Sequence, residues 1–259
     1  TVVQKEFLIK DYTAEFCLLE DFLRARKWVF NPGKFAAIQG EVGTDGVVVV
    51  GDFYSPLKML HLTMGPINSV YFLMEHPEKA KLLLDIHEEA QLKIIRETME
   101  NGVKVIMAMD NLDTMFHPPE YVRQYSASFY EKASSICHEY GGKFFIHACG
   151  NQKDNLELIA SLGVDGLEGV VFPPMGNVEL DEAMELSSGN FIITGGISAV
   201  ETKELKIREE VFNYVENLFT RLKPYKNRFI FAASCNTAIN TPWETIKHFR
   251  DAWNEFKSI

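Results

Sequence analysis

The run Lys143-Phe144-Phe145-Ile146 is followed directly by His147-Ala148-Cys149-Gly150. A short apolar and aromatic run after the turn signal Gly141-Gly142 is typical of a buried strand. A histidine and a cysteine one residue apart offer an imidazole nitrogen and a thiolate, which are donors that zinc prefers. This stretch therefore predicts a strand with a candidate metal site at its carboxyl end.

Five other short runs of the same kind alternate with longer segments of helical period. The six expected strands are Val47–Val50, Val103–Met107, Lys143–Ile146, Val164–Leu167, Phe191–Thr194 and Phe229–Ala232. The clearest expected helices are Pro77–Met99, Pro119–Tyr140, Gln152–Ser161 and Glu204–Leu222. Alternating strands and helices are typical of a parallel sheet, and the regular Gly and Asn turns before the strands favour a barrel over an open sheet. We expect an α/β fold of (β/α)8 TIM-barrel type, as a single domain over residues 1–259.

The amino-terminal part of the chain carries two weaker signals. Residues Val2 to Ile9 indicate a hairpin, and Thr13 to Phe30 indicate one amphipathic helix.

Composition and charge narrow the classes of function. The chain has 259 residues, 46% of them hydrophobic, which is enough for a sizeable core. With 26 basic and 36 acidic residues its net charge is −10, and it contains neither a basic run nor an apolar stretch of about 20 residues. Nucleic acid and membrane are therefore poor candidates for partners. Four scattered cysteines do not make a disulfide framework and favour a reduced, cytoplasmic setting.

Polar residues follow most of the expected strands. In a barrel these carboxyl ends meet at one rim, where the reacting groups of such enzymes lie. Cys235 follows the run ending at Ala232, so it is expected near His147 and Cys149 as a third ligand, leaving one position of a zinc ion open. The other candidates at the same rim are Tyr54, Asp110, Asn111, Asp113 and Glu168.

These motifs, taken in order, resemble the uroporphyrinogen decarboxylase superfamily and, within it, the cobamide-dependent methyltransferases. The matching segments are Gly51-Asp52-Phe53-Tyr54-Ser55-Pro56-Leu57, Met74-Glu75-His76-Pro77-Glu78, Met109-Asp110-Asn111-Leu112-Asp113, His147-Ala148-Cys149-Gly150, Leu162-Gly163-Val164-Asp165-Gly166, Gly195-Gly196-Ile197-Ser198 and Ser234-Cys235 with Thr241-Pro242-Trp243-Glu244. The resemblance implies that His147, Cys149 and Cys235 hold zinc. It also implies that a corrinoid, carried by a separate protein, exchanges a methyl group with a small methyl donor or a thiol acceptor.

The chain departs from the family pattern at its beginning. Members of the superfamily start with a strand and an arginine-bearing loop that have no counterpart before the region matched here. The resemblance therefore implies that the first two barrel strands are absent from this chain, which leaves sheet edges that a partner or a second copy of the chain could cover.

The individual residues have expected roles beside plainer alternatives. We expect Glu168 as a fourth zinc ligand that substrate displaces, Asp110 and Asp113 as catalytic proton donors, and Asn111 and Tyr54 as substrate contacts. Asp110, Asn111 and Asp113 could equally cap the helix entering at Pro118 or build a turn.

Two other functions stay open from the sequence. One is metal-free decarboxylation of a porphyrinogen-like substrate, which needs basic residues at the mouth of the barrel. The other is a non-catalytic barrel subunit with a structural zinc, for which closed four-ligand coordination would be the signature.

Overall fold

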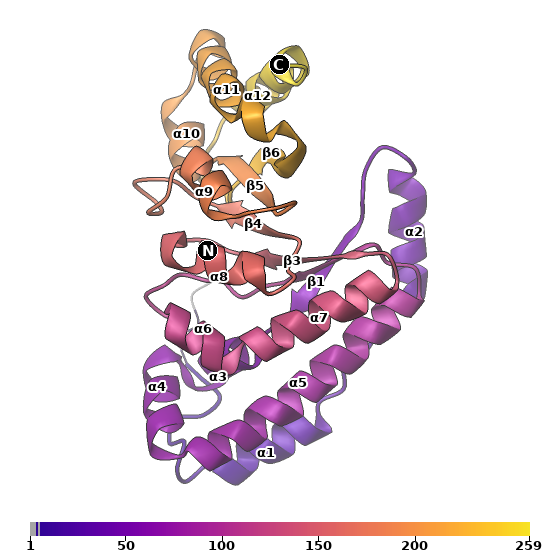
Figure 1. The fold of residues 1–259 in the computed structure, drawn as a ribbon, viewed down its shortest axis with the longest axis vertical. Helices are drawn as coiled ribbons and strands as arrows, with labels where there is room; N and C mark the ends of the chain where they lie inside the picture. Colours follow the sequence, from indigo (N-terminus) through magenta and orange to yellow (C-terminus); the bar gives the residue numbers. More distant parts are fainter. Residues whose placement is uncertain (1–3, 5) are drawn as a thin grey trace. The chain divides into compact units, whose positions relative to one another are not determined.

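Six strands alternate with helices in the computed structural model, which describes residue 4 and residues 6–259 (Figure 1). The chain divides into two compact units, one of residues 1–110 and 120–144, the other of residues 111–119 and 145–259. Within each unit, strands that follow one another in the sequence pair in parallel. The α/β class with helices between parallel strands is therefore confirmed.

The first unit combines a pair of strands with most of the longer helices. β1 (Val49–Phe53) pairs with β2 (Val105–Ala108). The helices are α1 (Phe16–Ala25), α2 (Pro32–Val42), α3 (Pro56–Met64), α4 (Pro66–Glu75), α5 (Pro77–Glu100), α6 (Pro119–Tyr125) and α7 (Ala127–Glu139). Proline occupies the first turn of α2 to α5, where its fixed φ suits a helix start and its missing N–H costs nothing. A buried cluster that includes Leu19, Leu60, Phe72 and Leu83 joins α1, α3, α4 and α5.

The second unit contains the strands that carry the candidate metal site. β3 (Lys143–His147), β4 (Gly166–Val170), β5 (Ile192–Ile197) and β6 (Phe229–Ala233) pair in chain order, all parallel. The intervening elements are η1 (Lys153–Asn155), α8 (Leu156–Ser161), α9 (Leu180–Leu186), α10 (Ala199–Glu204), α11 (Arg208–Leu222), η2 (Lys223–Arg228) and the final α12 (Trp243–Phe256). A second cluster of Val211, Phe212, Val215, Phe249 and Ala252 joins α11 to α12. β3 starts in one unit and ends in the other, so its His147 belongs to the second.

All six predicted strands are present, whereas two predicted helices are broken and a third begins late. The segment predicted as Pro119–Tyr140 is interrupted at Ser126. The helix predicted as Glu204–Leu222 begins only at Arg208, because Glu204 itself is the last residue of α10. Residues predicted as one helix from Gln152 form a 3-10 turn followed by α8. Apolar spacing continues across each break, so the hydrophobic pattern alone could not reveal it.

The amino-terminal predictions were less accurate. The helix expected from Thr13 begins only at Phe16, because Asp11 accepts hydrogen bonds from the backbone N–H groups of Thr13 and Ala14 and holds a turn there. It ends at Ala25, since Arg26 is extended. The expected hairpin lies partly on residues 2, 3 and 5, outside the described residues, and its described residues, Gln4 and Glu6 to Ile9, form no strand.

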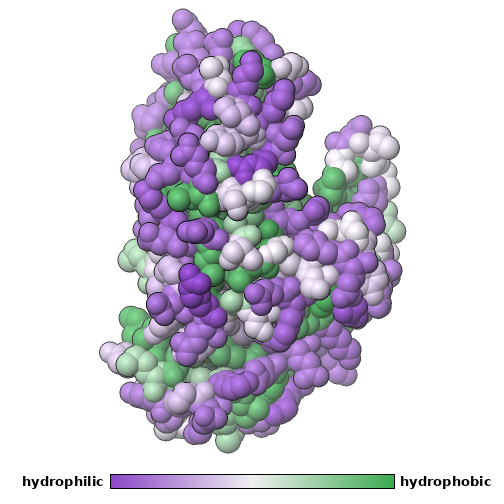
Figure 2. Space-filling view, in the orientation of Figure 1, coloured by the Kyte–Doolittle hydropathy of each residue, from purple (hydrophilic) through white to green (hydrophobic). Residues whose placement is uncertain are grey.

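The face drawn in Figure 2 is mostly hydrophilic, and it shows an apolar area over α4. The exposed Ile67, Tyr71 and Met74 recur there at helical spacing, while Phe72 and Leu73 face the core. No helix among the described residues is long and apolar enough to cross a bilayer.

Close strand pairing in the second unit can be tested at Gly166 in β4. A Cβ at this position would lie far inside contact distance of the carbonyl oxygen of Ile192 on β5 and at 2.7 Å from the ring of Phe145 on β3. We expect Gly166→Ala to lower the free energy of unfolding by about 1–3 kcal/mol, because backbone cannot move aside cheaply. Urea unfolding measures the change.

Gly40 in α2 is the matched control, since a Cβ there meets nothing within 4 Å. Gly40→Ala should leave stability unchanged or raise it by up to about 1 kcal/mol through helix propensity. Equal destabilisation by both variants would contradict the packing described for β4.

Candidate metal centre

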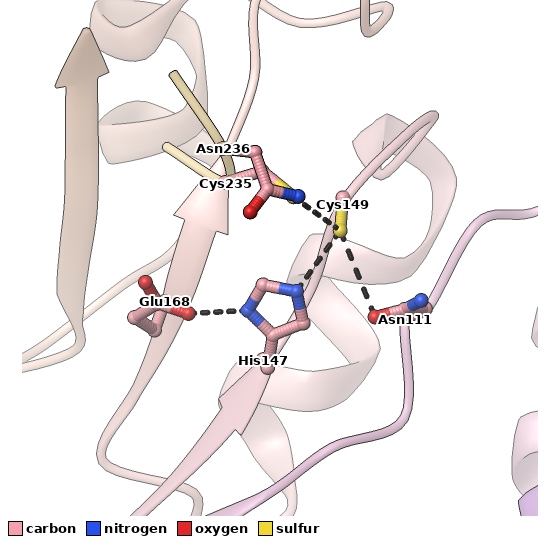
Figure 3. Close-up of polar contacts among 6 residues, drawn as sticks. All are labelled: Asn111, His147, Cys149, Glu168, Cys235 and Asn236. Carbon is pink, nitrogen blue, oxygen red and sulfur yellow. Dashed lines mark hydrogen bonds and ion pairs between the residues drawn. The ribbon is translucent and has the colours of Figure 1, made fainter. Parts of the chain in front are cut away.

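His147, Cys149 and Cys235 come together in the second unit (Figure 3). One nitrogen or sulfur from each residue lies within 4.8 Å of the other two. The sulfur of Cys149 is 3.0 Å from Nε2 of His147 and 3.5 Å from the sulfur of Cys235, although the two cysteines are 86 positions apart. All three side chains are partly buried. The convergence expected from the strand ends is therefore present.

Strand register places Glu168 beside His147. His147 ends β3 and is the register partner of Glu168 on β4, so the two side chains leave the sheet at the same level. The Glu168 carboxylate contacts Nδ1 of the ring, while Nε2 faces Cys149 (Figure 3). A ring proton on Nδ1 that is donated to Glu168 leaves the lone pair of Nε2 free for a metal. The expected ligation by Glu168 itself stays a prediction.

A braced loop holds Cys149. Gly150, the next residue, has φ +89°, and a Cβ there would collide with the carboxylate of Asp113. That carboxylate accepts hydrogen bonds from the backbone N–H groups of Asn151 at 3.0 Å and Met115 at 2.8 Å. Asp113 therefore ties the loop after β2 to the loop after β3, and its expected catalytic role stays a prediction.

Asn111 lies on the other side of Cys149. It adopts φ +49°, which asparagine tolerates better than most residues, and its backbone N–H donates to the carbonyl of His147 at 2.9 Å. Its Oδ1 accepts from the Cys149 thiol at 3.6 Å. The side chain expected to contact substrate is thus adjacent to a candidate ligand.

Cys235 is positioned by the residue before it. The buried Ser234 accepts a hydrogen bond from the backbone N–H of Gly196 at 3.1 Å and donates its own backbone N–H to Ile197 at 2.8 Å. These bonds fix the end of β6 against the end of β5. Gly169, with φ +87°, allows the Ser234 carbonyl to approach β4, because a Cβ there would collide with it.

One neighbour of the centre had no role assigned from the sequence. Asn236 donates its side-chain N–H to the sulfur of Cys235 at 3.5 Å. A polar residue directly after a candidate ligand was the only available signal, and it is a weak one because loops are rich in asparagine.

The donor set fits a zinc ion. A tetrahedral zinc with bonds near 2.3 Å to sulfur and 2.0–2.1 Å to nitrogen separates two sulfurs by about 3.8 Å and sulfur from nitrogen by about 3.6 Å. The observed separations of 3.5 and 3.0 Å are about 0.3 and 0.6 Å shorter than those values. Small side-chain shifts would complete the geometry with three protein donors.

Asp110 and Tyr54 belong to the first unit. Asp110 is fully buried, and its carboxylate accepts hydrogen bonds from the backbone N–H of Ser55 at 2.9 Å and from the hydroxyl of Tyr130. Burial raises the pKa of Asp110, although the two hydrogen bonds oppose the shift. This arrangement ties the turn before α3 to α7. The expected roles of Asp110 in proton transfer and of Tyr54 in substrate binding stay predictions.

The comparisons with known proteins agree with this fold. The sequence model of the family described as uroporphyrinogen decarboxylase (URO-D) matches residues 36–256, which is most of the chain. The chain belongs to the uroporphyrinogen decarboxylase family. No curated protein matches it.

Solved structures include a similar fold. One is a "methyltransferase from Methanosarcina mazei", with a TM-score of 0.65 and 19% sequence identity over 97% of this chain and 68% of that one. At this identity the likeness establishes the fold, and it supports the expected barrel class.

The proximity of the two sulfurs predicts a pattern of thiol reactivity. Zinc should slow alkylation of Cys149 and Cys235 by iodoacetamide at least about tenfold, because a metal-bound thiolate is shielded from the reagent. Mass spectrometry of zinc-loaded and chelator-treated protein gives the rate at each cysteine.

The other two cysteines are internal controls. Cys17 is exposed and should react equally in both samples, while the buried Cys137 should react only after unfolding. Zinc-independent labelling at Cys149 and Cys235 would contradict the site.

Burial of Asp110 predicts a pH dependence of stability. Because the pKa of this acid is higher in the folded than in the unfolded state, its contribution is greatest below the unfolded pKa and is lost as pH rises through the folded pKa. Relative to Asp110→Asn, the wild type should therefore lose stability as pH rises from the ordinary carboxyl pKa of 3.8 toward the raised pKa of the folded state, by about 1.4 kcal/mol for each unit of pKa difference. Urea unfolding across this range measures the difference, and parallel curves for the two proteins would show that Asp110 titrates normally.

Proposed function

We propose that the chain is a zinc-dependent methyltransferase, which moves a methyl group between a small donor or thiol acceptor and a corrinoid carried by a separate protein. The observation that carries the proposal is the convergence of one imidazole and two thiol groups within 4.8 Å. Three protein donors with partial exposure are typical of catalytic zinc, in which a fourth position receives water or substrate. The similarity in fold to a methyltransferase supports the same reaction class.

A zinc ion at this centre would lower the pKa of a bound substrate thiol or polarise the oxygen of a methyl donor, which eases transfer of the methyl group. The chain's own residues prepare the donors. Glu168 accepts the Nδ1 proton of His147 and keeps the ring oriented, which is how outer residues commonly hold a histidine ligand. Glu168 is also a candidate for the fourth ligand. To bind the metal, its carboxylate would have to break its contact with Nδ1 of His147.

Two asparagines flank the sulfurs and affect their charge. Asn236 donates an N–H to Cys235, which stabilises negative charge on that sulfur and makes it a weaker electron donor. Asn111 lies beside Cys149, and its proposed role is to contact a substrate that approaches the centre. Asp113 supports the centre by holding the loop that carries Cys149. Proton transfer by Asp113 or Asp110 is a further part of the proposal.

The two units are proposed to form one family domain, because the family match from residue 36 to residue 256 runs through both. The proposed location is the cytoplasm, where reducing conditions keep the sulfurs of Cys149 and Cys235 available as thiolates.

Metal-free decarboxylation is the second candidate, and the name of the family favours it. Such a reaction has no need of a pair of thiols held 3.5 Å apart. If the chain decarboxylates a porphyrinogen-like substrate and keeps that activity after both cysteines are replaced, the decarboxylase is favoured.

Loss of the metal ligands tests the proposed function directly. We expect His147→Ala, Cys149→Ala and Cys235→Ala each to lower bound zinc well below one per chain and to reduce methyl transfer at least about 100-fold, since binding and chemistry share the site. Elemental analysis gives the zinc content. The absorption change of methylcobalamin or reduced cobalamin, with a panel of thiols and methyl donors, gives turnover.

Glu168→Gln separates a positioning role from ligation. If Glu168 acts through His147, the variant should keep zinc at high protein concentration but bind it about 10–100-fold more weakly. Cys17→Ala is the control, because this exposed cysteine lies in α1 of the first unit.

The proposed function would be overturned if Cys149→Ala and Cys235→Ala both kept full zinc content and full turnover of the methyl donor or thiol.

A further inference from the structure

The first unit contains a pocket of about 240 Å³, and none of its lining residues belongs to the candidate metal centre. The segment after α1, the residue after β1, α3 and α5 contribute to its lining. Three large apolar side chains, those of Leu8, Phe22 and Leu62, line it and are nevertheless exposed to solvent. Exposed apolar groups gathered around one hollow are typical of a ligand site.

Arg26 is the charged residue in this lining. Its guanidinium lies over the ring of Trp28, 4.0 Å from the ring centre, and 5.7 Å from that of Phe22. Within the described part of the chain, its side chain has neither an ion pair nor a hydrogen bond, whereas Arg24 nearby is paired with Glu20 at 2.8 Å. Stacking fixes the plane of the guanidinium and leaves the N–H groups at its edge available for an anion.

The polar groups beside Arg26 do not neutralise it. His87 is buried, and burial lowers its pKa to about 4, so it is uncharged at neutral pH. Its Nε2 is hydrogen-bonded to the backbone carbonyl of Tyr54 at 3.0 Å, and the Tyr54 N–H donates to Gln91 at 3.1 Å. The Tyr54 hydroxyl faces Asp52 at 3.5 Å, and Asp52 does not line this pocket. Tyr54 is therefore held in place while the positive charge of Arg26 stays unmatched.

We propose that this pocket binds a small organic anion, whose carboxylate or sulfonate group pairs with Arg26 and whose apolar body packs against Leu8, Phe22 and Leu62. The planar fork of N–H donors in arginine matches both acid groups, since a carboxylate and a sulfonate each present two oxygens that can accept a pair of parallel hydrogen bonds. In a chain with net charge −10, an unpaired cation beside exposed apolar side chains makes this site selective for an anion over a neutral molecule of the same shape. The inference goes beyond the proposed methyl transfer and requires neither zinc nor a corrinoid.

Calorimetric titration with benzoate and benzenesulfonate, and with benzyl alcohol as the uncharged comparison, tests the site. We expect saturable binding of at least one anion, and binding of benzyl alcohol at least about tenfold weaker. Arg26→Gln should weaken binding of the anion at least about tenfold, or about 1.4 kcal/mol. Arg26→Lys should retain part of the affinity, because it keeps the charge and loses the fork. Trp28 lies under the guanidinium, so its fluorescence should change on binding in the wild type.

Two controls show whether the anion binds at Arg26 or elsewhere on the protein. Arg24→Gln removes a neighbouring charge on α1 and should leave affinity within about twofold of wild type, as expected for an exposed ion pair. The double variant Cys149→Ala with Cys235→Ala should also bind the anion normally, which excludes binding to zinc and keeps the outcome independent of the proposed function.

Three results would overturn the inference. They are the absence of binding by either anion up to about 10 mM, equal affinity for benzyl alcohol, and unchanged affinity in a folded Arg26→Gln protein. Circular dichroism and thermal melting establish whether that variant is folded. A pocket already occupied by a second copy of the chain would give the first result together with a dimer in solution.

Discussion

Parallel pairing of β3 with β4 is the constraint on which the candidate centre depends. Parallel strands in register carry equivalent side chains at the same level, and this pairing sets His147 beside Glu168. The contact of Glu168 with Nδ1 then determines which ring nitrogen faces Cys149. A register shift of one residue would turn His147 to the opposite face of the sheet and separate it from Glu168 and Cys235. Strand register therefore determines the chemistry as well as the fold.

Pairing of β5 with β6 has the same effect on the distant cysteine. Ile197 and Ala233 are the last register pair, and Ser234 continues this pairing with hydrogen bonds to the ends of β5. Cys235 is the first residue beyond the buried Ser234, so little chain freedom separates it from the sheet. A thiol on a long loop would lose more conformational entropy on reaching the same place. The short distance from strand end to sulfur explains how residues 86 positions apart can form one preorganised site.

The sequence predicted the strands and the convergence of His147, Cys149 and Cys235 well, because both follow from short local patterns. Short apolar runs mark strands, and in parallel strands the next residues share one edge of the sheet, so His147, Cys149 and Cys235 could be grouped from the sequence alone. Helix breaks such as that at Ser126 were missed, since apolar spacing continues across them. The roles of Asp113 and Asp110 depend on which backbone N–H groups they meet, and those partners lie on other elements. Arg26 was missed for a similar reason, because its unmatched charge is a property of its three-dimensional surroundings.

The number of soft donors distinguishes a catalytic from a structural role for the centre. A structural zinc of this type is enclosed by four protein ligands, usually cysteine and histidine. Among the described residues, His147, Cys149 and Cys235 form the single cluster of three or more candidate donors. Cys17 and Cys137 lie on α1 and α7 in the first unit, so neither is a fourth donor within the second unit. Glu168 is a further candidate, and it is engaged with the ring of His147. A metal held by the three donors would therefore keep a position for a molecule from outside, which a reaction needs and a structural site does not.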